Sequence, residues 1–186
     1  MPNLSAYGSN PDQQAVERLL GRPARVPFTV LKRCPDGSPQ VVQAEPVFQE
    51  DGIWKPFPTI YWLLCPKLRL AISHLEQGGF LKSMLSRLEQ DSAFREAFLR
   101  GQSAVCECRV RRAAQILPQP LSENMAKVLR ETSIAGSHHL LGLKCLHAHA
   151  AHTLAGGENP VGEAILAATG SCDGIHQEST GGGATE

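Results

Sequence analysis

An α+β fold is expected for this 186-residue chain, with a small antiparallel three-stranded sheet in the N-terminal third followed by a mainly helical C-terminal region. Short runs of β-branched and aromatic residues, separated by turn residues, occupy positions 28–64 and predict strands. After Pro66 the apolar residues recur at helical spacing instead. Strands that precede the helices, rather than alternate with them, are typical of α+β domains.

Three segments, 28–31, 40–44 and 59–64, are expected to form the sheet. The first two flank the sequence Cys34-Pro35-Asp36-Gly37-Ser38-Pro39. This sequence predicts a tight turn, because proline fixes φ and Asp-Gly accepts a left-handed backbone conformation. A second turn is expected at 50–52, where the sequence is Glu-Asp-Gly.

Helices are expected before and after the strands along the chain. One covers 13–20, and the others begin at 66, 80, 91 or 92, 124, 141 and 161. The helix that begins at 141 is expected to run to 154, where Gly156-Gly157 ends it. We expect residues 1–12 to be a flexible leader, 13–169 a single α+β domain and 170–186 a disordered tail rich in Gly, Ser and Thr.

The composition excludes several classes of protein. Eighteen basic residues balance eighteen acidic ones, so no net charge favours nucleic acid or anionic lipid as a partner. The longest apolar stretch, 60–65, is far shorter than the ~20 residues of a membrane-spanning helix. No signal peptide is recognisable, and six scattered cysteines then predict reduced thiols and a cytoplasmic location.

The segment 144–152 has the densest chemistry, because three of the seven histidines lie within six residues. On a continuous helix Cys145, His149 and His152 fall on one side at positions i, i+4 and i+7. His147 points toward the apolar side of the same helix. One helix rarely supplies all four ligands of a tetrahedral zinc ion, so further thiols are needed.

Cys34 in the first turn and Cys65 at the end of the third strand can supply those thiols. The predicted metal site is therefore a zinc site, with Cys172 in the tail regarded as incidental. Its ligands are Cys34, Cys65, Cys145 and His149, with His152 and His147 as further candidates. A structural alternative stays open, since a buried cysteine often serves as a small apolar residue and a helical histidine often lies at the surface.

Three functions fit these residues. The first is a non-enzymatic metal-binding domain in which zinc attaches the late helix to the sheet. The second is an enzyme centred on Cys145 and His149, either a metal-dependent hydrolase or one with a cysteine nucleophile. The third is an interaction module for an unknown protein partner. No catalytic residue is assigned by the sequence.

The chain resembles the bacterial family called domain of unknown function 501 over about residues 18–165. That family has no assigned activity, so the resemblance implies a bacterial cytosolic protein and no catalytic residues. The residues that carry the resemblance are Arg33-Cys34-Pro35 with Gly37 and Pro39, Pro56-Phe57-Pro58-Thr59-Ile60-Tyr61-Trp62-Leu63 through Cys65-Pro66, Leu75-Glu76 with Gly78, Lys144-Cys145-Leu146-His147-Ala148-His149 through His152, and Asn159-Pro160-Val161-Gly162.

Overall fold

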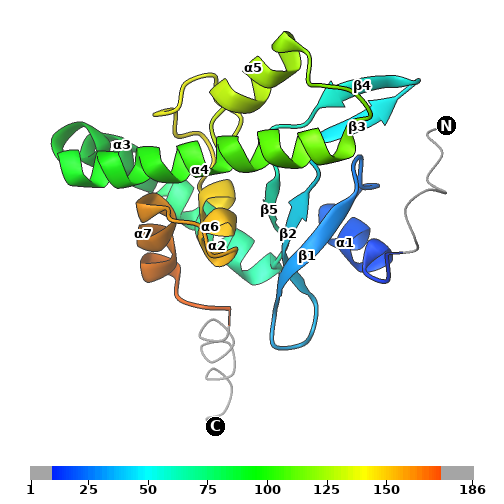
Figure 1. Ribbon diagram of the computed structural model, residues 1–186. Coiled ribbons are helices and arrows are strands. Elements are labelled where there is room, and N and C mark those ends of the chain that lie inside the picture. The colour runs from blue at the N-terminus through cyan, green and yellow to red at the C-terminus, as the bar shows by residue number, and fades with distance from the viewer. Residues whose placement is uncertain (1–9, 173–186) are drawn as a thin grey trace, which may run out of the picture.

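The computed structural model describes residues 10–172 and confirms the α+β fold (Figure 1). Strands come first along the chain, apart from one short helix, and a run of helices follows them. The elements are α1 (Gln13–Leu20), β1 (Phe28–Arg33), β2 (Pro39–Ala44), β3 (Val47–Glu50), β4 (Ile53–Pro56), β5 (Tyr61–Leu63), α2 (Pro66–Gln77), α3 (Phe80–Gln90), α4 (Ser92–Ile116), α5 (Glu123–Glu131), α6 (Leu146–Leu154) and α7 (Pro160–Thr169).

The three expected strands form one antiparallel sheet in the order β1-β2-β5. Successive side chains of the central strand β2 point to opposite faces of the sheet, and nearly all of them are buried, so both faces of this strand are covered. Val42 packs with α1 in a small cluster around Val16, whereas Val41 and Leu63 join the main core with the later helices. A second pair of strands, β3 and β4, flanks the predicted turn at 50–52 and was not expected from the sequence.

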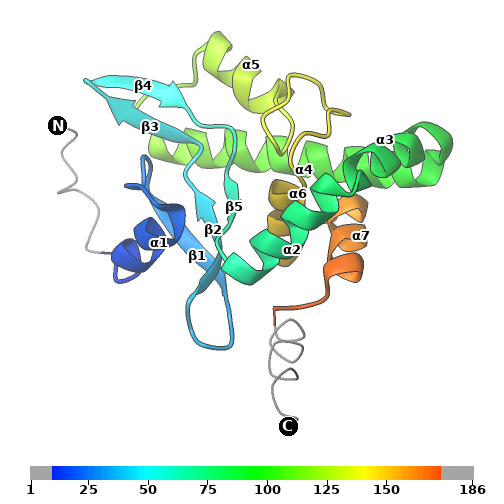
Figure 2. The same ribbon diagram turned by 180° about the vertical axis from the view of Figure 1, so that it is seen from behind.

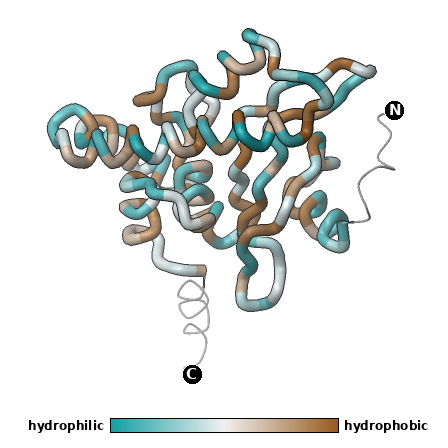
Figure 3. Tube along the Cα trace, viewed as in Figure 1, coloured by the Kyte–Doolittle hydropathy of each residue, from teal (hydrophilic) through white to brown (hydrophobic). Residues whose placement is uncertain are grey.

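The helices lie mainly on the side of the sheet opposite α1. In Figures 1 and 2 the long helix α4 runs across the molecule, with α2, α6 and α7 grouped beside it. Helix α6 contacts β5, α2 and α7, and is therefore enclosed. Figure 3 shows that apolar and polar residues alternate along α4, as expected for a helix with one buried face.

Helix α6 begins at Leu146, so the expectation of a helix from 141 was wrong at this end. Cys145 has an extended backbone, with φ −133° and ψ 111°. A carboxylate oxygen of Glu76 in α2 accepts the N–H of Leu146 at 2.9 Å and satisfies the first donor of the helix. Cys145 therefore precedes the helix and does not share one helical row with His149 and His152.

Two expected terminal segments lie largely outside the described residues, namely 1–9 of the leader and 173–186 of the tail. At the described edges the chain is packed. Asp12 forms an ion pair with Arg33 at 2.7 Å, and Cys172 is 4% exposed. Between residues 10 and 172, every helix is too short or too polar to cross a membrane.

Candidate metal centre

Three buried thiols converge where the sheet meets the helices. Cys34 follows β1, Cys65 precedes the first residue of α2, and Cys172 follows α7. Their sulfur atoms all lie within 4.8 Å of one another, and those of Cys65 and Cys172 are 3.3 Å apart. Ligand atoms bonded at about 2.0–2.3 Å to one tetrahedral zinc ion lie about 3.3–3.8 Å apart, so this spacing suits zinc.

Local sequence explains how two of these thiols are placed. Gly37, with φ 81°, closes the turn after β1, and its N–H donates to the carbonyl oxygen of Cys34 at 2.9 Å. Pro66 occupies the first turn of α2, where its missing N–H costs no hydrogen bond, so the helix starts directly after Cys65. Each cysteine thus sits at a fixed bend of the backbone next to a proline.

The thiol cluster, Cys34, Cys65 and Cys172, belongs to the main hydrophobic core. Burial raises the pKa of the Cys34 thiol. Burial and the two neighbouring thiols raise the pKa of Cys172 to about 12. Without a cation these two thiols therefore stay neutral at physiological pH. A divalent ion reverses this preference, because metal ligation requires and stabilises the thiolate form.

Cys145 belongs to a second group, the Glu76–Cys145–His147 cluster. Its sulfur lies 3.8 Å from Nδ1 of His147, and that nitrogen lies 3.6 Å from Oε1 of Glu76. The three ligand atoms lie within 4.8 Å of one another, and all three residues are partly exposed. This group joins the start of α6 to the last turn of α2.

Hydrogen bonding lowers the pKa of Cys145 and raises that of His147. Burial alone would raise the pKa of Cys145, but hydrogen bonds from His147 and from the backbone N–H of Ala148 outweigh it and lower the pKa. The hydrogen bond with Cys145 raises the pKa of His147 against the opposing effect of burial. The pair therefore favours a thiolate beside an imidazolium more than isolated side chains would.

His149 and His152 form a third, fully buried arrangement around Asn159. The N–H of Gly162 donates to Oδ1 of Asn159, so the amide nitrogen faces Nδ1 of both rings, at 3.0 Å for His149 and 3.4 Å for His152. Burial and the nearby His152 lower the pKa of His149 to about 3, while burial and Arg109 lower that of His152 to about 4. Both rings are therefore neutral acceptors at pH 7.

The four residues expected to form one site thus occupy three places. Cys34 and Cys65 lie together as expected, but their third partner is Cys172 rather than Cys145 or His149. Sequence reasoning treated Cys172 as incidental, and the structure corrects this, because the thiol is buried against Cys65. Nothing near Cys172 in the sequence signals the contact. The packing of α7 against α2 creates it.

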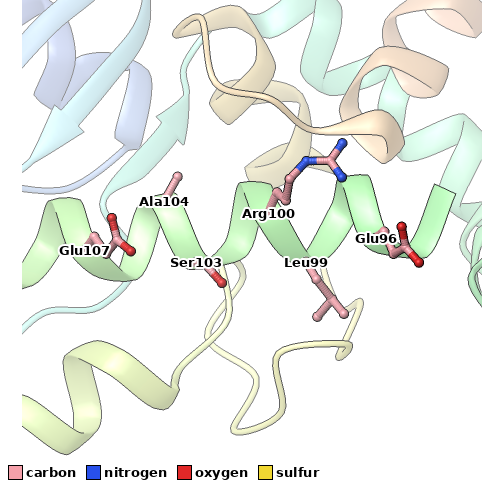
Figure 4. A pocket seen from close by; sticks show the side chains of 6 residues that line it. All are labelled: Glu96, Leu99, Arg100, Ser103, Ala104 and Glu107. Carbon is pink, nitrogen blue, oxygen red and sulfur yellow. The ribbon is translucent and has the colours of Figure 1, made fainter. Parts of the chain in front are cut away.

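A surface hollow along α4 shares no residue with these three groups. Figure 4 shows that its lining side chains all project from this one helix. They include neither cysteine nor histidine, and Arg100 is already paired with Glu158 at 2.7 Å. We therefore do not include this hollow in the candidate site.

Comparison with protein-family models matches residues 30–167 to the family described as "Protein of unknown function (DUF501)". The chain belongs to this family. The match includes Cys34, Cys65, Cys145 and His147 but ends before Cys172. Neither the search of curated proteins nor that of solved structures found a match. The family membership confirms the resemblance seen in the sequence, and its description assigns no activity.

Proposed function

We propose that this protein is a zinc-binding domain in which Cys34, Cys65 and Cys172 hold one ion that stabilises the fold. The observation that carries the proposal is the convergence of three buried sulfur atoms within 4.8 Å from three separate parts of the chain. Thiols that serve only as small apolar residues have no reason to meet at one point.

The donor set favours a soft metal. Thiolate sulfur suits zinc and other soft ions and is a poor ligand for Mg²⁺ or Ca²⁺, which prefer oxygen. Among residues 10–172 no fourth Cys, His, Asp or Glu joins the thiol cluster. Water or a group from outside those residues would complete the tetrahedron. The sequence-based set with Cys145 and His149 is replaced in this proposal by one that includes Cys172.

The proposed role is structural because of where the thiols lie. Each thiol is at most 7% exposed, which leaves little room for a substrate to approach the ion. The ion would link the turn after β1, the start of α2 and the segment after α7. These segments are separated by up to 138 residues in sequence (172 − 34), so one ion would close a long loop and stabilise the domain.

Zinc content measured on single-cysteine variants tests this proposal. Protein purified without chelator is analysed for metal per chain, together with Cys65→Ser, Cys172→Ser and the matched control Cys108→Ser, which alters a thiol outside both metal-ligand groups. We expect the first two variants each to lose one zinc ion and the control to lose none. Equal zinc content in wild type and in both site variants, or a Cys65–Cys172 disulfide in the freshly purified protein, would overturn the proposal.

A further inference from the structure

We propose that the Glu76–Cys145–His147 cluster is a second metal site, one that keeps a coordination position open to solvent. The donors are a carboxylate oxygen, a thiolate sulfur and an imidazole nitrogen. Their separations of 3.6 Å and 3.8 Å around Nδ1 of His147 suit ligands of a single zinc ion. The site uses no atom of the thiol cluster and does not depend on the function proposed above.

The imidazole of His147 is already oriented for ligation. Its Nε2 lies 3.0 Å from the carbonyl oxygen of Arg69, which can only accept a hydrogen bond. Nε2 therefore carries the hydrogen in the neutral ring, and the lone pair of Nδ1 faces Cys145 and Glu76. A backbone carbonyl that fixes the tautomer of a histidine in this way is a regular outer partner of metal-bound imidazole.

A hydrogen bond also fixes the position of the Glu76 carboxylate. Its Oε1 accepts the N–H of Leu146 at 2.9 Å, which fixes the oxygen at the start of α6. A carboxylate oxygen has two lone pairs, so it can accept this hydrogen bond and still ligate an ion. The site is therefore built by the contact between α2 and α6, with little rearrangement needed on binding.

Charge and exposure indicate what the site would do. Thiolate and carboxylate together balance the charge of a divalent ion, and the thiol and imidazole disfavour Mg²⁺ and Ca²⁺. The side chains of His147 and Glu76 are 22% and 33% exposed, in contrast to the sealed thiol cluster. Three protein ligands with access to solvent are the pattern of zinc sites that bind an exchangeable water or a small anion.

The test uses zinc as the probe in a Cys65→Ser background, which removes the first proposed site. We expect this variant to bind about one zinc ion per chain by titration calorimetry, and to release it to a chelator faster than wild type releases its thiol-bound ion. Adding His147→Gln should abolish the remaining binding. His74 is an exposed histidine on the same helix as Glu76, and adding His74→Gln should leave the zinc binding unchanged.

Glu76→Gln provides a second variant that keeps the fold. The amide oxygen can still accept the N–H of Leu146, but the negative charge is lost. We expect zinc affinity to fall by at least about 10- to 100-fold. Removal of a residue that only hydrogen-bonds to a metal ligand already causes a loss of this size. Circular dichroism verifies folding of each variant. Unchanged affinity in His147→Gln and Glu76→Gln would overturn this inference while leaving the thiol site untouched, since Cys65→Ser and Cys172→Ser report on that site alone.

Discussion

Acid is expected to destabilise this fold through two buried histidines, His149 and His152, which are 0% and 3% exposed. Their pKa values are lowered to about 3 and about 4, whereas a histidine in the unfolded chain has a pKa near 6.5. The unfolded state therefore binds protons first as the pH falls. Stability attributable to the two neutral rings is complete above about pH 6.5 and decreases as the pH falls toward 4.

The size of the effect follows from these pKa values. Between pH 7 and pH 5, protonation of one such histidine in the unfolded chain lowers the free energy of unfolding by about 2 kcal/mol. Two histidines together give about 4 kcal/mol, a large part of the 5–15 kcal/mol typical of a domain. His147, whose pKa is raised, acts in the opposite direction. A comparison of variants is therefore more informative than wild type alone.

The assay is urea unfolding of wild type and His152→Gln at pH 7, 6 and 5 under identical metal conditions. Contributions from the other groups largely cancel in the difference, and the pKa of His149 stays low without His152 because burial is its main cause. We expect the variant to be less stable at pH 7 but to lose about 2 kcal/mol less than wild type on going to pH 5. The exposed His74→Gln should behave like wild type. An identical pH dependence in wild type and His152→Gln would refute the reasoning, because it would mean that His152 takes up protons equally in the folded and the unfolded protein.

Three further perturbations test the packing and the metal. Gly101→Ala should lower the free energy of unfolding in urea by about 1–3 kcal/mol, because a Cβ there would lie 2.0 Å from the carbonyl oxygen of Glu158. Gly78→Ala is the control: its Cβ would meet no atom nearer than 3.4 Å, so stability should change by less than about 0.5 kcal/mol. Arg109→Met should lower the free energy of unfolding by about 3 kcal/mol. The fully buried guanidinium donates hydrogen bonds to backbone carbonyls at the end of α5, and these would lose their partner. An unchanged midpoint in urea would contradict this. Removing zinc with a strong chelator should lower the melting temperature by about 10 °C, as loss of a ligand present at about 1,000 times its Kd does in a domain of this size. Cys172→Ser, which keeps only the Glu76–Cys145–His147 site, should show a smaller decrease.

Much of the secondary structure could be predicted because its signals are local. Turn residues fix the bend after Cys34, and side-chain caps mark the starts of α4 and α5, where Asp91 and Ser122 accept backbone N–H groups. The strands β3 and β4 were missed because each is a run of only four residues that mixes apolar and polar side chains, whereas the longer apolar run at 60–65 indicated β5. The start of α6 was misplaced because Glu76, seventy residues earlier in the chain, decides it.

The sequence by itself determined the order of strands and helices, the family, and the presence of chemically active residues such as Cys34, Cys65, Cys145 and the nearby histidines. Only the tertiary structure decided which of them meet. Ligand groups depend on contacts between segments far apart in the chain, and hydrophobic periodicity carries no information about which faces pair. Packing of α7 beside α2 brings Cys172 to Cys65, and contact of α2 with α6 brings Glu76 to Cys145 and His147, while His149 turns toward Asn159.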